Sequence, residues 1–237
     1  MGGQRASSGG RAVAARARRE RAVALSAELI VDRALELTER EGSAALTMRR
    51  LGEELGVDPT AVYRHFRDKD DLVLACMDRI IDNAYASLQP GLDPGDWRAV
   101  LRAVAQTSWA MCEAHPAIYA LTFYRVTGGP GERKMVELLL STLAGTGLPA
   151  DRTVLYYRAF IDAILGVCGM KAATHSLGDG LQEKDGSAWT RIYAVLPQAE
   201  YPAARAHAQE LAAVTQREIY TTIVDAVIRL IEDALPT

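Results

Sequence analysis

Apolar residues recur at helical spacing along most of the chain, and this pattern predicts an all-α fold. The first helix is expected to begin near Leu25, where apolar positions start to repeat every three or four residues. Gly42 should end this helix, because glycine readily adopts the left-handed conformation found just after helix ends. The apolar stripe of this helix comprises Leu29, Ile30, Ala34 and Leu37. No segment alternates as a strand would, and no internal repeat is visible.

The same reasoning divides the rest of the chain into helices and breaks. Further helices are expected over residues 68–88, 97–114, 118–124, 133–143, 151–174, 188–196 and 203–235. The expected breaks, rich in glycine, proline and polar residues, are 89–96, 127–132, 145–149 and the polar loop SLGDGLQEKDGS at 176–187.

Residues 46–72 carry the most specific signal in the sequence. Thr47 can cap a first short helix, because its hydroxyl accepts from a free backbone N–H. Gly56 allows a tight turn, Asp58 caps a second short helix, and Pro59 occupies its first position, where the missing N–H costs nothing. Two short helices joined in this way predict a helix-turn-helix that reads DNA.

The second short helix has one face for the core and one for DNA. Val62 and Phe66 lie four residues apart and should anchor the helix. Arg64 has the geometry to fork onto guanine, which is worth about 1–3 kcal/mol of discrimination. The full outward face comprises Thr60, Ala61, Tyr63, Arg64 and His65.

Two further cations flank this reading face. Arg49 lies early in the first short helix and Lys69 at the start of the next long helix, so both are expected to hold phosphates. Asp68 should cap that long helix, with Asp71 as its capping-box partner.

The run Tyr63-x-His65-Phe66-x-x-Lys69, with both caps and the turn, resembles the DNA-binding domain of the tetracycline-repressor (TetR) family. The resemblance covers roughly residues 25–74. It implies a homodimeric, all-helical, ligand-responsive transcription regulator, usually a repressor. It also places Arg49, Thr60, Tyr63, His65 and Lys69 where the family contacts DNA. The complete set of predicted DNA-binding residues is Thr47, Arg49, Pro59, Thr60, Ala61, Tyr63, Arg64, His65 and Lys69.

Two positions depart from the tetracycline repressor itself. Met48 stands where that protein has a polar DNA-contacting residue, and Arg64 stands where it has an aromatic residue. The operator is therefore expected to differ. The domains predicted are a disordered basic arm over 1–24, a helix-turn-helix domain over 25–72, and a helical regulatory and dimerisation domain over 73–237.

One helix-turn-helix covers only half an operator, so a second copy is expected. The helix from residue 151 carries small residues on one face, which allow two helices to approach closely, and the last helix has a wide apolar arc. A four-helix interface, two helices from each subunit, would use both. The alternative is that the small face packs within one chain. The predicted interface residues are Ala159, Ala163, Gly166, Met170, Tyr220, Ile223, Val227 and Ile231.

The central helices supply the material for an apolar effector pocket with a few polar groups. Each residue has an alternative role in the ordinary core. The residues predicted to line the pocket are Trp109, His115, Phe123, Tyr124, Tyr157 and Phe160. His115 also suits the negative end of a helix dipole, and neither a metal nor a cofactor is expected.

Charge is distributed unevenly along the chain. The net charge is −3, yet residues 1–24 contain six arginines against Glu20 alone. A basic end on an acidic body favours a single DNA-facing pole. The arm is expected either to contact DNA or to serve only as a solubilising tail.

Three widely spaced cysteines, with no paired CxxC motif, argue against a disulfide framework or a zinc site and fit a reducing cytosol. No signal-peptide run and no uninterrupted stretch of about 18 apolar residues occur, so a cytoplasmic protein without a membrane partner is expected. The sequence carries no P-loop, nucleophile elbow or HExxH motif, so no enzyme is predicted. The expected function is a repressor that binds a palindromic operator as a homodimer and releases it when a small apolar or aromatic effector binds. A ligand-independent or architectural DNA-binding protein is the alternative, and a small-molecule carrier is a weaker one.

Overall fold

The computed structural model describes residues 25–88, 91–93 and 95–235, and within these ranges it contains helices and no strand. The predicted basic arm over 1–24 lies outside the described residues. An N-terminal head is built from three helices with one 3-10 turn, Ser43–Ala45. The helices of the head are α2 (Ala27–Glu41), α3 (Met48–Leu55) and α4 (Pro59–Tyr63).

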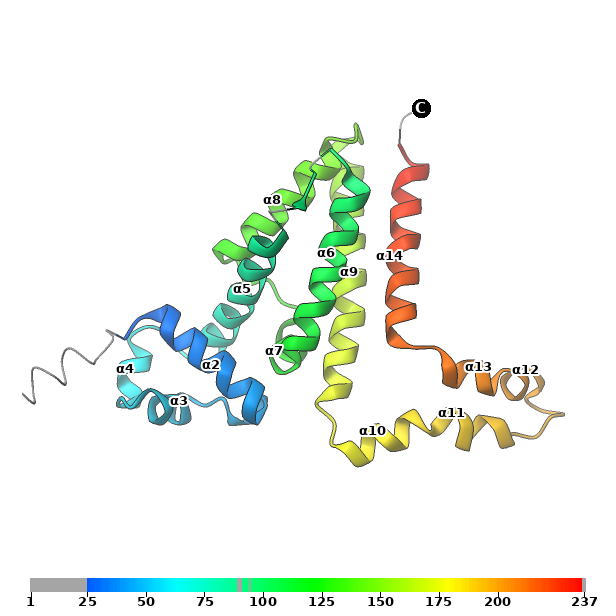
Figure 1. Cartoon of the computed structure of the whole chain (residues 1–237), viewed down its shortest axis with the longest axis horizontal. Coiled ribbons are helices and arrows are strands. Elements are labelled where there is room, and N and C mark those ends of the chain that lie inside the picture. The colour runs from blue at the N-terminus through cyan, green and yellow to red at the C-terminus, as the bar shows by residue number, and fades with distance from the viewer. Residues whose placement is uncertain (1–24, 89–90, 94, 236–237) are drawn as a thin grey trace, which may run out of the picture.

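The body follows the head directly. Its helices are α5 (Lys69–Leu88), α6 (Trp97–Ala114), α7 (Pro116–Thr122), α8 (Pro130–Ala144), α9 (Ala150–His175) and α14 (Gln216–Asp233). Figure 1 shows the head at one lower end, α5 rising from it, and α9 in the middle of the body. The helix α9 contacts α6, α7, α8 and α14, and the head contacts the body through α2 against α5 and α7. The helix α9 is thus connected to the head through α7, which packs on both α9 and α2.

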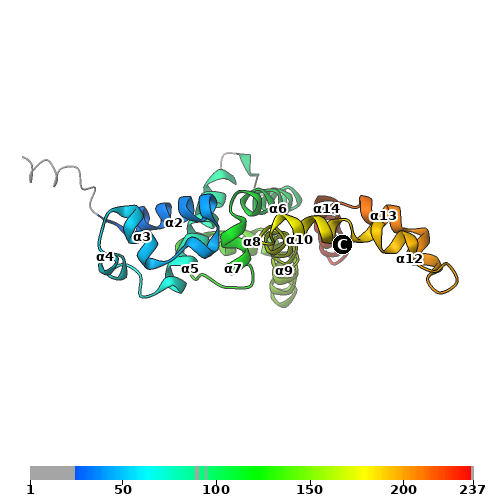
Figure 2. The same cartoon turned by 90° about the horizontal axis from the view of Figure 1, so that it is seen from below.

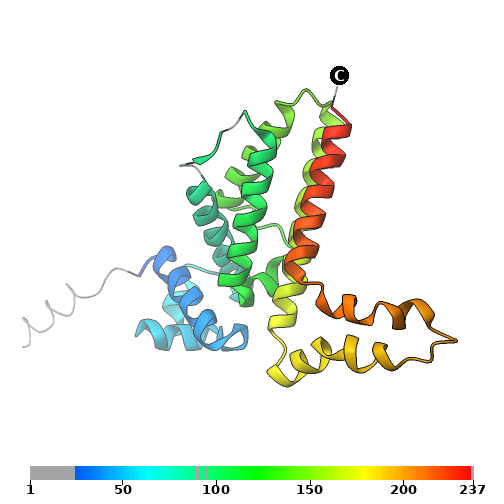
Figure 3. The ribbon, with the colours of Figure 1, turned by 45° about the vertical axis from the view of Figure 1, so that its right-hand side comes forward.

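Four short helices project sideways between α9 and α14. They are α10 (Asp179–Gly186), α11 (Ala188–Arg191), α12 (Pro202–Ala206) and α13 (Ala208–Ala213), with a 3-10 turn at Tyr193–Val195. We call them the lateral helices. They run out from the lower end of the body and return as a narrow hairpin (Figures 2 and 3).

Most predicted helices are present, and the differences have local causes. The helices α7 and α8 begin two to three residues earlier than expected, because Pro116 and Pro130 each occupy a first turn, where proline is well accommodated. The predicted loop at 176–187 is wrong, since most of it forms α10. The Gln182 amide donates to the carbonyls of His175 and Leu177, and so satisfies the end of α9.

The last predicted helix, over 203–235, is also wrong in its extent. It is divided into α12, α13 and α14. Thr215 caps α14 through a full capping box, in which Glu218 N–H donates to the Thr215 hydroxyl and the Thr215 N–H donates to the Glu218 carboxylate. The T-x-x-E signal for this start was visible in the sequence.

The helix α9 is long and apolar enough to cross a membrane by length and composition alone. Its place at the centre of the body accounts for that composition, because it packs on four other helices. It also carries the charged pair Arg158 and Asp162, 3.1 Å apart on successive turns. We interpret α9 as a core helix with one uncovered side.

Cys76, on α5, provides a test of the packing between head and body. Its side chain is fully buried against α2, and burial raises the pKa of the Cys76 thiol to about 12. The thiol should therefore stay protonated at pH 8 and resist a thiol-specific reagent, because the thiolate is the reactive form. Mass mapping after native labelling should leave the Cys76 peptide unmodified, and labelling in denaturant should modify it. Complete native labelling would contradict this packing.

Candidate DNA-binding interface and effector cavity

The turn between α3 and α4 forms as the sequence predicts. The Arg50 N–H donates to the Thr47 hydroxyl over 3.1 Å, so Thr47 caps α3. Gly56 ends α3 at φ 66°, in the left-handed region that glycine adopts without strain. Asp58 caps α4 by accepting from the Thr60 N–H at 2.9 Å, and Pro59 takes the first helical position. The caps and turn therefore hold α4 firmly against α3.

Gly52 is a positioning residue that the sequence reasoning missed. A Cβ at this residue would lie 3.1 Å from the Val57 carbonyl oxygen and 3.2 Å from Pro59. The absence of a side chain thus lets α3 and α4 approach closely. A glycine in the middle of an eight-residue helix was the signal available in the sequence.

The predicted outward face of α4 is exposed. Tyr63 is 52% exposed, and Thr60, Arg64 and His65 are also exposed, whereas Ala61 is half-buried. On the other side Val62 and Phe66 are buried in the core of the head, as predicted. The Thr60 hydroxyl donates to Asp58 over 2.7 Å, which fixes the threonine methyl in one rotamer.

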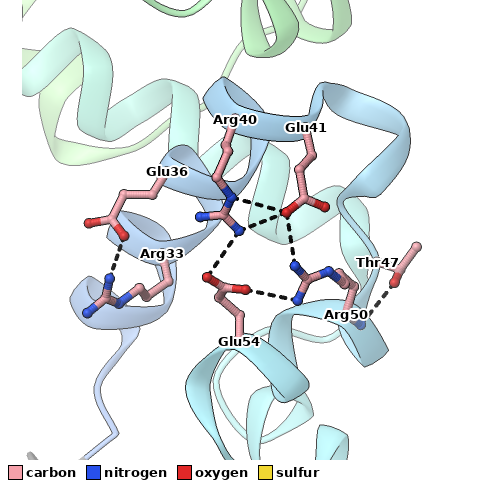
Figure 4. A network of polar contacts seen from close by, with 7 residues as sticks. All are labelled: Arg33, Glu36, Arg40, Glu41, Thr47, Arg50 and Glu54. Atoms are coloured by element: carbon pink, nitrogen blue, oxygen red, sulfur yellow. Dashed lines mark hydrogen bonds and ion pairs between the residues drawn. The ribbon is translucent and has the colours of Figure 1, made fainter.

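Four charged residues lock α3 to the end of α2 (Figure 4). The Arg50 guanidinium reaches Glu41 and Glu54, each at 2.9 Å, and Arg40 reaches the same two carboxylates at 2.8 and 3.1 Å. The hydrogen bond that Arg50 donates to Glu41 keeps the pKa of Arg50 above its usual value. Arg50 therefore positions α3, and its neighbour Arg49 is the cation left facing solvent.

The two cations predicted to hold phosphates are accessible. The Arg49 side chain is 85% exposed and makes only an exposed pair with Glu53 at 3.1 Å. The Lys69 amine lies 3.5 Å from the Ser43 carbonyl oxygen at the surface. Asp68 caps α5 through the Asp71 N–H, as predicted. The predicted capping-box role of the Asp71 carboxylate is wrong, because that group accepts from Arg67 instead.

A cavity of about 80 Å³ lies in the body among α5, α6, α7, α8 and α9. Its wall is mostly aliphatic, with Met77, Ile80 and Ile81 from α5 and a few polar groups. The polar side chains of the wall are Ser108, Tyr119, Thr122, Arg125, Glu132 and Tyr157. Arg125 is the single cation among the described residues of this wall. The cavity wall therefore combines apolar surface with one cation, Arg125, and one carboxylate, Glu132.

Two of the six predicted pocket residues, Phe123 and Tyr157, border this cavity. The ring of Phe123 packs directly on the backbone of Gly169 in α9, where any side chain would collide with it. Burial raises the pKa of Tyr157, so its hydroxyl stays a neutral hydrogen-bonding group. The cavity is thus closed on one side by Phe123.

The other four predicted pocket residues lie elsewhere. Trp109 packs on Tyr220 with ring centroids 4.9 Å apart, and Phe160 is fully buried in the core. Tyr124 is 72% exposed. His115 lies in a surface groove between head and body, with its Nδ1 atom 2.7 Å from the Glu39 carboxylate of α2. Helical spacing marks such residues as apolar or aromatic, but it does not separate cavity wall from core.

The loop that leads into α8 is fixed on α5 by a buried carboxylate, Asp78. This carboxylate accepts from the N–H groups of Gly131 and Glu132 at 3.1 and 2.9 Å and from the Thr127 hydroxyl at 3.1 Å. Asp78 thus caps α8 from a neighbouring helix. This contact, absent from the sequence prediction, links the cavity wall to α5.

A second contact joins the cavity wall to the first turn of α5. Arg125 makes a two-pronged ion pair with Asp70, with one prong measuring 2.7 Å and the other shorter. Asp70 follows Lys69, a predicted phosphate contact. The hydrogen bonds of this pair lower the pKa of Asp70 and raise that of Arg125. The pair is therefore charged at neutral pH and lies between cavity and head.

One side of α9 and α14 carries uncovered apolar residues. Leu155 and Met170 on α9 are 51% and 56% exposed, and Ile219 and Leu230 on α14 are 36% and 52% exposed. Between them lie the half-buried predicted interface residues Ala159, Ala163, Gly166, Ile223 and Val227. The other two predicted interface residues, Tyr220 and Ile231, lie in the chain's own core, where the Tyr220 hydroxyl donates to the Ala105 carbonyl oxygen over 2.7 Å.

Comparisons with known proteins agree with these features. The model for bacterial regulatory proteins of the tetR family matches residues 30–76, and the model for the tetracyclin repressor-like C-terminal domain matches residues 89–224, more than half of the chain. The HTH-type transcriptional repressor Rv1353c of Mycobacterium tuberculosis is 31% identical over 148 residues. That match covers 61% of this chain and 56% of the repressor, so the chain matches only about half the length of that relative.

Solved structures show the same fold. The transcriptional regulator SCO7222, a TetR from Streptomyces coelicolor, has a TM-score of 0.70 and 28% identity, and the match covers 90% of this chain and 100% of that one. ActR from the same organism, solved in complex with actinorhodin, has a TM-score of 0.76 at 19% identity, covering 90% and 98%. The helix-turn-helix, the helical body and both family matches lead to one conclusion. This chain belongs to the tetracycline-repressor (TetR) family of bacterial regulatory proteins.

Proposed function

We propose that this protein is a cytoplasmic transcriptional repressor that binds a palindromic operator as a homodimer and releases it when a small, largely apolar effector binds. The observation that carries the proposal is the outer face of α4. Tyr63 ends α4, and Arg64 and His65 follow it in the adjoining turn; all three are exposed. Caps, a close glycine contact and an ion-pair network hold this helix in place. A rigid helix with an exposed basic and aromatic face suits the major groove.

The proposal of a homodimer is based on the apolar side of α9 and α14 that a single chain leaves exposed. A monomer gains nothing from leaving Leu155, Met170, Ile219 and Leu230 in water, and a second copy would cover them. Gly166 has open space around it, so the backbone of a partner helix could approach there. Two copies related by a twofold axis would present two α4 helices to an inverted repeat.

The proposal of a small-molecule effector is based on the cavity in the body. Its position among α5 to α9, next to the contacts that join body and head, suits a site that changes how the heads are held. ActR, a protein of the same fold, has been solved with actinorhodin. An effector for this chain is proposed from the chemistry of the cavity wall, which is mostly apolar with one cation and one carboxylate.

The DNA-reading assignment has a direct test. Replacing Arg64 by alanine should relax base preference at one operator position, at a cost of about 1–3 kcal/mol for the preferred sequence. Replacing Lys69 by alanine should weaken all sequences alike and lower the slope of log affinity against log salt by about one. Both effects are measured by fluorescence anisotropy on a panel of single-base operator variants.

Arg152→Ala is the matched charge control, because Arg152 is exposed on the first turn of α9. In Figure 1 the start of α9 lies at the top of the body, away from the head. It should leave operator affinity and salt slope unchanged. Unaltered base preference in Arg64→Ala would refute the role of Arg64. Binding that depends on salt but not on sequence in the unmodified protein would favour the architectural alternative.

A further inference from the structure

Arg125 connects the cavity to the first turn of α5, where the body follows the head. It is the third residue after α7, and its guanidinium both borders the cavity and pairs with Asp70 on the first turn of α5. Its backbone N–H donates to the Thr122 carbonyl oxygen over 2.8 Å, so the segment that carries it is tied to the end of α7. A change at the cavity wall is thereby coupled to the start of α5.

Among the described residues of the cavity wall, none forms an ion pair with Arg125. Glu132, the acidic residue of the wall, accepts from the Gly128 N–H at 2.5 Å, so its carboxylate is already engaged. Tyr119 and Tyr157 contribute neutral hydroxyls. The partner of Arg125 is thus Asp70, which lies outside the cavity and is 57% exposed.

The size of the cavity adds a second argument. At about 80 Å³ it is far smaller than the roughly 300–1,000 Å³ of typical small-molecule pockets. An effector larger than this cavity must therefore push the wall outward. Phe123, which packs on Gly169, and Arg125 lie on the same short segment after α7, so opening the wall displaces the residue that holds Asp70.

We propose that the effector is an aromatic acid whose carboxylate displaces Asp70 from its ion pair with Arg125. Loss of this ion pair frees the start of α5 to move, and the head moves with it. The inference rests on the proposed effector function and adds the ligand's charge and the switching contact. Two carboxylates compete for one guanidinium, and a planar guanidinium fork suits either. Because binding and release are linked, the operator must weaken acid binding by the same factor as the acid weakens operator binding.

The test compares three aromatic acids, benzoate, 2-naphthoate and anthracene-2-carboxylate, with their uncharged carboxamides. Affinity for the dimer is measured by calorimetry, and operator release by anisotropy with operator DNA selected from a random pool. In the unmodified protein the acids should bind more tightly than the amides. Arg125→Gln should weaken acid binding by about tenfold or more and leave amide binding unchanged, since a hydrogen bond to a charged group is lost.

The Asp70→Asn variant tests whether the acid competes with Asp70 for Arg125 or is only attracted by the charge of Arg125. It should tighten acid binding by about fivefold, at the low end of typical coupling, and make the acid poor at releasing DNA. Arg125→Lys, which keeps the charge, should restore part of the acid preference. Asp32→Asn is the matched control, because the Asp32–Arg79 pair is also an ion pair of α5 with nearly the same exposure, but it does not border the cavity. It should behave as the unmodified protein.

Equal binding of acids and amides, or acid preference retained in Arg125→Gln, overturns the inference and leaves the effector cavity standing. Unchanged acid affinity in Asp70→Asn overturns the competition. Failure of both series to bind the unmodified protein counts against the effector cavity itself, and therefore against the proposed function as well as this inference.

Discussion

Gly131→Ala should destabilise the protein by about 3 kcal/mol, at the upper end of the usual cost of overpacking. Gly131 is buried in the first turn of α8, where a Cβ would lie 2.8 Å from the Asp82 backbone nitrogen and still closer to the Asp78 carbonyl oxygen. Both atoms belong to the backbone of α5, so they cannot rotate away as a side chain could. The helices must therefore separate, and the hydrogen bonds that Asp78 accepts from the start of α8 weaken with them.

The measurement is chemical denaturation followed by helical circular dichroism. Gly180→Ala is the matched control, because Gly180 lies in α10 with open space around it, and its replacement should be neutral or slightly stabilising. A midpoint for Gly131→Ala equal to that of the control would show that α5 and α8 do not approach as described.

Leu230→Glu should abolish the dimer at micromolar concentration and with it tight operator binding. Leu230 is 52% exposed in a single chain, so the change spares the fold, but in the proposed dimer it would bring two like charges into an apolar interface. Like charges opposed across an interface cost several kcal/mol, which corresponds to at least about a hundredfold weaker association. Operator binding follows, because a monomer presents one α4 helix to one half-site.

Association is measured by sedimentation velocity across a range of concentrations. Val126→Glu serves as the control, because Val126 is 72% exposed on the loop between α7 and α8 and belongs to neither α9 nor α14. It should leave the dimer intact. A Leu230→Glu protein that sediments as a dimer would exclude this side of α14 from the interface.

The head was predictable because its signals are local. Thr47, Gly56, Asp58 and Pro59 act on backbone groups within three residues of themselves, so the sequence determines the turn almost completely. The order of the body helices followed from apolar spacing in the same way. Glycines misled the prediction at α10, where Gln182 and its neighbours form helix between Gly180 and Gly186.

The cavity was less predictable because it depends on contacts between distant residues. Spacing cannot reveal that Trp109 meets Tyr220, that Asp78 caps α8, or that Arg125 reaches Asp70. The same limit applies to the predicted interface, because the inward side of the apolar arc of α14, with Tyr220 and Ile231, belongs to the chain's own core. Which residues line a pocket depends on how the helices pack, so the lining can be identified only from the three-dimensional structure.

Selection of bound DNA from a random duplex pool would show whether this protein reads DNA as a dimer. An inverted repeat should be enriched, because two α4 helices related by a twofold axis read the same bases on opposite strands. Each half-site should contain a position, read by Arg64, that loses its preference in Arg64→Ala. Recovery of a single unrepeated site, or of no preferred sequence at all, would contradict a dimeric sequence-reading repressor.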